Sequence, residues 1–435
     1  MSQSTKAKHT SDRPVAALIG QITGWQRDLV LSVMTQLIQK FPGLFAAVIL
    51  ARHFDKDLIG QFFFCGVIGS IAATASHLGT DRELRRSVAQ RPEDALDMLG
   101  QILPLRLATT LLLWICINLA VALLAPDLLQ ISALTTAYLL VGDLFYTFSA
   151  VFVGFRWMGL RLAVGAIGPL LISVSSLAVL QGWSLASVLG LYIVANAIMV
   201  AVAARVMHAH VGPVRLQWRL DTLRPVLLVG LPFLATEMVL LLQSKVDVLM
   251  IFALSTAEQV ADYETSYRLL EVTRTLVRPL MMVFVPIAAA MAFTSKQAEL
   301  TRLVRRLITA VCLAGTALAL ICVAMAEPIV TTIWGENFRS GASIFAVLAL
   351  STIPLFLSMT CVQLAGALHR ERDCLKILAP CALVNIVLNG FVIPHYGALG
   401  AAWTTVVTEC LAAACLLALI LSATRKPIAA EKHVG

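Results

Sequence analysis

Four charged side chains recur at helical spacing within the otherwise apolar residues 261–286. At 3.6 residues per turn they share one face of a helix, within an arc of about 120°. Arginine binds phosphates and carboxylates through forked donors, so this net-positive face predicts a hydrated cavity that binds an anion. The alternative is a ladder of salt bridges to neighbouring helices, with any arginine near a helix end extending to the membrane surface. The four residues are Arg268, Glu271, Arg274 and Arg278.

A second polar face lies in the apolar segment that precedes Pro42 and Gly43. Gln36, Gln39 and Lys40 fall on one side of this segment, because their spacing returns to the same face of a helix. We expect these side chains to line a cavity of the same kind. The alternative is that Lys40 neutralises an acidic side chain in a neighbouring helix.

Acidic side chains also fall inside apolar segments, where a charge costs about 2.5–3.5 kcal/mol and therefore requires a reason. Glu237 and Asp247 lie on one side of their segment and either serve a function or pair with the arginines of residues 261–286. Asp143 and Glu409 are lone acids in their segments. Each is either a coupling site for a proton or sodium ion, or a buried carboxyl kept neutral by desolvation.

Acids and bases inside the apolar segments balance, five against five, so the interior is not cationic as a whole. The positive character is local to the two faces described above. The bases are Lys40, Lys245, Arg268, Arg274 and Arg278, and the acids are Asp143, Glu237, Asp247, Glu271 and Glu409.

The composition explains why each of these charges needs an explanation. Of the 435 residues, 59% are hydrophobic and 13% are charged, and the mean hydropathy is +0.85. A soluble domain carries about 25% charged residues, so this chain has too few polar side chains to cover a globule in water. The sequence predicts an all-α integral membrane protein that crosses the bilayer many times.

Several functional classes find no support in the sequence. The net charge of +8 is spread over short clusters between apolar segments, and no nucleic-acid-binding module is present. A nucleotide-binding glycine loop, a metal-binding histidine pair and a nucleophile elbow are all absent, which predicts neither enzyme nor cofactor nor metal site. The nine cysteines lie in or beside apolar segments without paired ligand spacings, as small hydrophobic residues do.

Segments of about 20 apolar residues are long enough to cross the hydrocarbon, and the sequence contains twelve. Lysine and arginine cluster in every second loop, so the positive-inside rule places both termini in the cytoplasm, in agreement with an even number of spans. The predicted spans are 29–52, 58–79, 101–125, 131–155, 163–181, 184–206, 226–253, 260–291, 304–327, 341–366, 374–393 and 398–421.

A weak internal repeat relates the two halves of the chain at an offset close to 200 residues. "FDKDLIGQF" at 54–62 resembles "STAEQVADY" at 255–263, and Leu105-Arg106-Leu107 resembles Arg305-Arg306-Leu307. Two parallel six-helix bundles are therefore expected, with a working site between them. The predicted domains are a cytoplasmic tail at 1–28, a first lobe at 29–206, a linker at 207–225, a second lobe at 226–421 and a cytoplasmic tail at 422–435.

The stretch "VNIVLNGFVIPHYGALGAAWTTVVTE", residues 384–409, combines packing features with a family signature. Asn385 and Asn389 lie one turn apart and can hydrogen-bond to another helix, while Pro394 and Gly397 predict a turn. The small residues after the turn allow close helix approach. The pattern resembles the C-terminal half of bacterial polysaccharide transporters, the lipid-linked oligosaccharide flippases of the multidrug/oligosaccharidyl-lipid/polysaccharide exporter superfamily. "FDKDLIGQF" and "IWGENF" at 333–338 are further points of resemblance.

The resemblance implies a V-shaped, two-lobed bundle that works by alternating access in the bacterial inner membrane. Proteins of this family move undecaprenyl-diphosphate-linked oligosaccharide units to the outer leaflet for surface polysaccharide synthesis, in the company of a polymerase and assembly proteins. The substrate and membrane lipid would be the main partners. Cationic cavity residues are thought to hold the diphosphate; the matching positions here are Lys40, Arg268, Arg274 and Arg278, with Gln36 and Gln39 beside them.

Two other functions are weighed against this one. A cation-coupled multidrug antiporter of the toxin-extrusion type shares the architecture but favours an acidic cavity. A membrane-embedded polysaccharide polymerase or acyltransferase would need a large polar loop or an intramembrane catalytic histidine, and the nearest candidate, His395, lies in a predicted outer turn.

Overall fold

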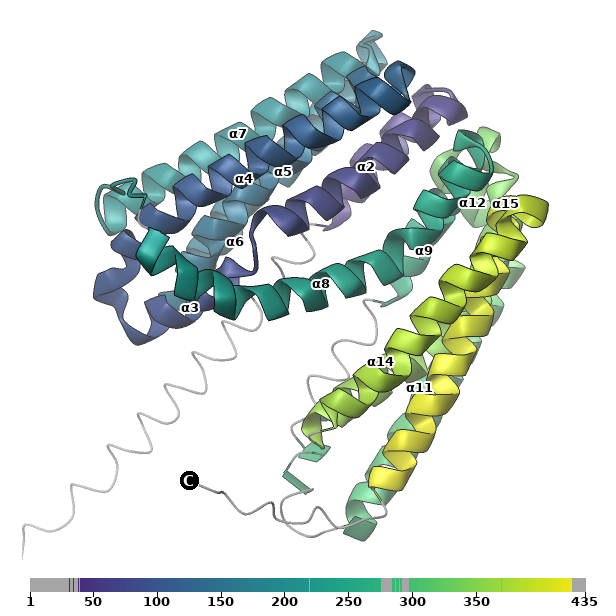
Figure 1. Cartoon of the computed structure of the whole chain (residues 1–435). Coiled ribbons are helices and arrows are strands. Elements are labelled where there is room, and N and C mark those ends of the chain that lie inside the picture. The colour runs from purple at the N-terminus through teal and green to yellow at the C-terminus, as the bar shows by residue number, and fades with distance from the viewer. Residues whose placement is uncertain are drawn as a thin grey trace, which may run out of the picture. The chain divides into compact units, whose positions relative to one another are not determined.

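Helices form every regular element in the described part of this computed structural model (Figure 1). Long apolar runs can satisfy their backbone groups in a membrane only within a helix or a closed barrel, and helical spacing of the polar residues selects the helix. The described residues are 31, 34, 38, 40–218, 220–274, 284, 285, 287, 288, 290, 291, 297–368 and 370–424.

The chain divides into two compact units. Unit 1 comprises Met1–Leu50 and Ile68–Leu240, and unit 2 comprises Ala51–Val67 and Leu241–Gly435. The two boundaries that separate them fall inside helices α2 and α8, so each of these helices contributes to both units.

Unit 1 is built around α5, which packs against α3, α4, α6 and α7. Its apolar core contains Leu84, Leu99, Phe148, Phe152 and Met207, all buried. The elements, with α2 and α8 shared, are α2 Lys56–Ser76, α3 Thr80–Gln90, η1 Pro92–Asp94, α4 Ala95–Leu124, η2 Pro126–Leu128, α5 Leu129–Gly154, α6 Met158–Ser176, η3 Leu177–Gln181, α7 Leu185–His210 and α8 Leu220–Leu254.

Unit 2 packs α14 against α15 and α11, with α13 against α9. Its apolar core contains Leu300, Val304, Phe356, Leu364 and Leu416, all buried. The remaining elements are α9 Ala257–Arg274, α11 Gln297–Ala324, α12 Ala326–Trp334, η4 Glu336–Phe338, α13 Gly341–Leu350, α14 Thr352–Ala367 and α15 Glu371–Ala423.

The outer surfaces of both units are apolar, as expected for helices that face lipid. Leu111, Leu123, Leu313 and Leu383 are among the large hydrophobic side chains more than half exposed. Seven helices in the described residues are long and apolar enough to cross a membrane, or nine when each of two bent pairs counts as one span. The chain is a multi-pass membrane protein.

Predicted spans and observed helices agree within a few residues along most of the chain. The count of twelve remains a prediction, because the first and eighth predicted spans run into residues outside the described ranges. Two helices were not predicted: α3, which has a polar composition, and α12, which occupies the loop that carries "IWGENF". Both are too short and too polar, or too short alone, to register as spans.

The predicted turn in the opening motif is present within α15. Gly397 has φ 57° and ψ −139°, so the helix is broken there and two helical halves meet at this residue. Asn385 and Thr408, on opposite sides of the break, hydrogen-bond at 3.3 Å, so the two halves fold back on each other. The carboxamide oxygen of Gln259 occupies the space beside Gly397 and accepts a hydrogen bond from the Ala398 amide at 2.7 Å.

Substituting Gly397 with alanine is expected to destabilise unit 2 by about 1–3 kcal/mol, because a Cβ would strain the left-handed backbone. That Cβ would also lie 1.7 Å from the Gln259 Oε1 atom. The thermal unfolding midpoint of the detergent-purified protein measures the effect. Gly366→Ala is the matched control, because nothing lies within 4 Å of its added Cβ; equal midpoints for the two variants would contradict the prediction.

Candidate functional site

The predicted basic face begins on α9 in unit 2 with a carboxylate shared by two bases. The Lys245 Nζ lies 3.0 Å from the Glu264 Oε1, and the Arg268 Nη2 lies 3.5 Å from the same oxygen. Glu264 is buried, with 4% of its side chain exposed. The Arg268 guanidinium also lies over the Phe63 ring, 4.6 Å from its centroid. Lys245 and Arg268 are therefore largely neutralised within the protein.

Arg274, one further turn along α9 and beyond, is placed differently. Its guanidinium lies over the Tyr267 ring, 5.0 Å from the centroid. It interacts electrostatically with Glu409 and Glu271, but no described carboxylate lies within the 4.0 Å of an ion pair. Its Nε is buried and has no hydrogen-bond partner among the described residues. Arg274 therefore retains donors that an anionic oxygen could accept from.

The set as a whole is electrically balanced. Three bases, Lys245, Arg268 and Arg274, face three acids, Glu264, Glu271 and Glu409, as the contacts and electrostatic interactions above show. Glu264 was missed by the sequence reasoning. Its position four residues before Arg268 is the spacing of a helical ion pair and could have revealed it.

Asp247 on α8 forms the centre of a buried polar network, not an ion pair with the arginines. Its Oδ2 accepts hydrogen bonds from the Tyr263 hydroxyl at 2.6 Å and the Thr405 hydroxyl at 3.1 Å. Its Oδ1 accepts one from the Asn389 amide at 2.6 Å. The suggestion that Asp247 pairs with the arginines of α9 is thus wrong, because these uncharged donors surround the carboxylate.

The asparagines of the opening motif complete this network. Asn389 donates to the Asn385 carboxamide oxygen at 3.1 Å as well as to Asp247, which confirms the expected hydrogen bond to another helix. Asn389 is fully buried, and its own oxygen has no partner among the described residues. Carboxylate, carboxamide and hydroxyl oxygens at one point are ligands for a proton or a hard monovalent cation. The described residues contain no cluster of three His, Cys, Asp or Glu side chains suited to a metal ion.

Asp143, in unit 1, is not a lone acid. Its Oδ2 lies 2.5 Å from the Arg106 Nη2, and it accepts a further hydrogen bond from Ser76 at 3.1 Å. Arg106 also binds the Asp81 Oδ1 at 2.7 Å and is only 1% exposed. Arg106 was treated as part of the repeat near a span end; one turn deeper in α4, it became a buried cation that two carboxylates hold.

Glu237, also in unit 1, contacts residues other than the arginines of α9. Its Oε1 lies 3.3 Å from the Arg82 Nη2, and its Oε2 lies 3.9 Å from the His77 Nε2. This corrects the suggested pairing with α9. The partners come from the turn between α2 and α3, which sequence spacing alone could not connect to α8.

The remaining predicted residues are only partly accessible to description. Lys40 is exposed in unit 1, whereas Arg268 and Arg274 belong to unit 2. Gln36, Gln39 and Arg278 lie outside the described residues. The structure therefore brings together Arg268, Arg274, Glu271 and Glu409 within unit 2, and leaves the participation of Lys40, Gln36, Gln39 and Arg278 as a prediction.

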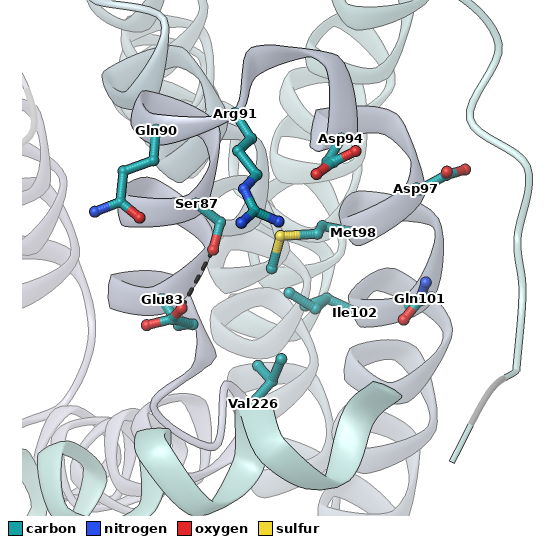
Figure 2. Close-up of a pocket in the computed structure, with 10 residues that line it drawn as sticks. All are labelled: Glu83, Ser87, Gln90, Arg91, Asp94, Asp97, Met98, Gln101, Ile102 and Val226. Atoms are coloured by element: carbon teal, nitrogen blue, oxygen red, sulfur yellow. Dashed lines mark hydrogen bonds between the residues drawn. The ribbon is translucent and has the colours of Figure 1, made fainter. Parts of the chain in front are cut away.

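A pocket of about 430 Å³ in unit 1 contains none of the predicted residues (Figure 2). It lies between α3 and the start of α4, where Figure 2 shows Arg91 near Asp94 and a hydrogen bond from Ser87 to Glu83. Three carboxylates and one guanidinium make its lining net acidic. It is poorly suited to an anion and does not replace the basic face as the candidate site. The pocket is lined by Glu83, Ser87, Gln90, Arg91, Asp94, Asp97, Met98, Gln101, Ile102 and Val226.

Solved structures share this fold across almost the whole chain. A multidrug resistance MATE family transporter of the MOP superfamily, in an inward-facing conformation, has a TM-score of 0.70 at 15% identity, covering 92% of this chain and 100% of its own. A lipid II flippase, MurJ, in an inward closed conformation, has a TM-score of 0.65 at 14% identity, covering 92% and 90%. A MOP superfamily transporter from Pyrococcus furiosus has a TM-score of 0.60 at 15% identity, covering 91% and 95%.

No curated protein matches the sequence. Residues 108–343, more than half of the chain, match a family described as "Polysaccharide biosynthesis protein". This match confirms the resemblance drawn from the sequence motifs, and the shared fold agrees with it. The chain is a member of the polysaccharide biosynthesis protein family, built on the fold of MOP superfamily transporters.

Proposed function

We propose that this chain is a flippase for polyprenyl-diphosphate-linked oligosaccharide units in the synthesis of a surface polysaccharide. Twelve spans in two six-helix lobes, 29–206 and 226–421, would carry the head group across the bilayer by alternating access. The work is transport and needs no covalent chemistry. Family membership and the lipid II flippase among the similar folds support this class of substrate.

The observation that carries the proposal is the environment of Arg274. A buried guanidinium with a free Nε donor, stacked on Tyr267 and without a described carboxylate in ion-pair contact, is prepared for an anion. A diphosphate offers the oxygens that such a fork binds. Arg268, Arg278 and Lys40, with Gln36 and Gln39, are proposed to complete the binding of the head group.

The physical chemistry of the substrate fits a membrane carrier. A charged diphosphate and several sugars cannot cross about 30 Å of hydrocarbon unaided, whereas the polyprenyl chain can remain in the lipid. A carrier therefore needs to hydrate and neutralise only the head group. The Asp247 network and Glu409 are proposed to take up the proton or monovalent cation that drives the cycle.

The location and partners follow from the same proposal. Both termini, including the tails 1–28 and 422–435, would lie in the cytoplasm, with the protein in the bacterial inner membrane. A polysaccharide polymerase and assembly proteins would receive the exported units on the other side.

A cation-coupled multidrug antiporter is the second candidate, and the buried Asp247 network is the observation that favours it. An organic cation or its coupling ion would bind such a carboxylate, and MATE transporters share the fold. The free donors of Arg274 argue against a cationic cargo.

A deletion strain tested for surface polymer and for drug susceptibility separates the two candidates. We expect deletion to abolish surface polymer and to cause lipid-linked units to accumulate, with no change in drug susceptibility. Plasmid-borne wild-type protein is the control and should restore the polymer. Normal polymer combined with increased susceptibility to several cationic drugs would reject the flippase and support the antiporter.

A further inference from the structure

Lys56, at the first residue of α2, holds that end of the helix within unit 2. Its Nζ lies 2.6 Å from the Asp262 Oδ2 and donates to the Ser340 Oγ at 2.6 Å. The side chains of the ion pair are 16% and 7% exposed. Close by, Arg52 donates to the carbonyl oxygens of Thr332 and of the next residue along α12. Three sequence motifs of the family resemblance thus meet at one point.

The other end of α2 continues into a turn that holds the first part of α8 within unit 1. Arg82, just after the turn, lies 3.3 Å from Glu237, and its guanidinium stacks over Phe233, 4.7 Å from the centroid. Within the turn, the Gly79 backbone touches Gly230 of α8 so closely that a Cβ would lie 2.1 Å from its carbonyl oxygen. The side chains of Arg82 and Glu237 are 47% and 33% exposed.

The two ion pairs share an arrangement that ordinary surface pairs lack. Each joins a residue from the first half of the sequence to one from the second, and each fixes a helix that is divided between the units. Residues up to Val67 of α2 belong to unit 2, and residues up to Leu240 of α8 belong to unit 1. α8 bends by 44° between Val226–Val239 and Leu241–Leu254, where the units divide.

Helix α2 also fixes the separation of the two pairs. It has 21 residues, and at 1.5 Å per residue it is about 31 Å long, close to the thickness of the hydrocarbon. One ion pair therefore lies at each membrane surface. A carrier that exposes its cargo to one side at a time needs a contact at each surface that can be made and broken independently.

We propose that Lys56–Asp262 and Arg82–Glu237 are two latches that open in alternation during transport, a proposal that rests on the transport function above. Partly exposed ion pairs can exchange their partner for water at modest cost, which makes them reversible. The Lys56–Asp262 latch is the more buried and so the more costly to open. The Arg82–Glu237 latch is therefore the first to open in the protein without substrate.

The test uses charge reversal and charge exchange at each latch. The single variants are Lys56→Asp, Asp262→Lys, Arg82→Glu and Glu237→Arg, and each latch also has the exchanged double variant. Asp373 and Lys376 form the matched control, since they are an exposed Lys–Asp pair within one helix of unit 2. Their exchange and single reversals should change nothing.

Opening is measured on purified protein by the labelling rate of one cysteine with a membrane-impermeant maleimide, in a background without the nine native cysteines. Ile59→Cys reports on the Lys56 end and Thr80→Cys on the Arg82 end; both positions are at most 1% exposed. We expect reversal at one latch to raise labelling about tenfold at its own reporter and not at the other. Exchanged pairs should return to the original rate. A variant that does not purify is replaced by Lys56→Gln or Arg82→Gln, with the same expected result.

Unchanged labelling in the single reversals, or simultaneous labelling at both ends in every reversal, would overturn the latch proposal. The labelling requires no substrate, so its outcome is independent of what the protein carries. Loss of the flippase function in the deletion test, together with the expected labelling, would reject only the cargo and keep the latches.

Discussion

Replacing Arg274 with glutamine is expected to reduce delivery of lipid-linked units about 100-fold without changing the amount of protein in the membrane. A lost charge-assisted contact to a desolvated anion costs about 2–5 kcal/mol, and 1.4 kcal/mol corresponds to tenfold. Arg274 is the cation with free donors in the unit 2 set, since its Nε has no described partner. Surface polymer and accumulated lipid-linked precursor, measured in the deletion strain, report the effect.

Two controls make the Arg274 result specific. Arg274→Lys keeps the charge but loses the fork, so we expect intermediate activity. Arg339→Gln removes an exposed guanidinium, 62% accessible, and should leave activity unchanged. Neutralising Arg278, which lies outside the described residues, is predicted from the sequence to block polymer production as well. Full polymer with Arg274→Gln at normal protein level would remove Arg274 from the site.

Replacing Arg106 with methionine is expected to lower the stability of unit 1 by about 3–5 kcal/mol, the usual cost of leaving a buried charge unpaired. The guanidinium is 1% exposed and binds Asp81 at 2.7 Å and Asp143 at 2.5 Å. Without it, two carboxylates would face each other with little water. The thermal unfolding midpoint in detergent measures the loss.

A second substitution separates the missing charge from the missing volume. Adding Asp143→Asn to Arg106→Met removes one uncompensated carboxylate, so the double variant should regain part of the stability lost in the single one. Arg86→Met removes an exposed arginine from α3 and is expected to have no effect. An Arg106→Met protein as stable as the original would show that the three-charge cluster does not support unit 1.

The helices were predictable because lipid imposes a strong constraint on sequence. A run of about 20 apolar residues has no alternative but a helix, so the spans beginning near Leu129 and Leu185 agree with α5 and α7 within a few residues. The break at Gly397 was also predictable, since proline and glycine close together mark a turn. By contrast, α12 was missed because nine residues are too few to register as a span.

The partners of the buried charges could not be predicted in the same way. Asn389 and Asp247 are 142 residues apart in sequence and 2.6 Å apart in space. Helical spacing identifies which residues share a face, but not which face of another helix meets it. Asp247, Glu237 and Asp143 were therefore singled out correctly as buried or partly buried acids, while the partners first suggested for two of them were wrong.

Local pairs were accessible to sequence reasoning and were partly overlooked. Glu264 and Arg268 are four residues apart on α9, a spacing that favours an ion pair. Including Glu264 would have shown that Arg268 is largely neutralised and that Arg274 is the stronger candidate for the anion.

The most direct test of the central claim, that a free arginine in a membrane helix bundle receives an anionic lipid head group, is transfer in reconstituted vesicles. Purified protein would be reconstituted with a fluorescent polyprenyl-diphosphate sugar or with the same lipid carrying an uncharged head group, and transfer between leaflets measured by quenching from outside. The account predicts rapid transfer of the diphosphate lipid alone, and its loss with Arg274→Gln. Equal transfer of both lipids, or full transfer by Arg274→Gln, would contradict it.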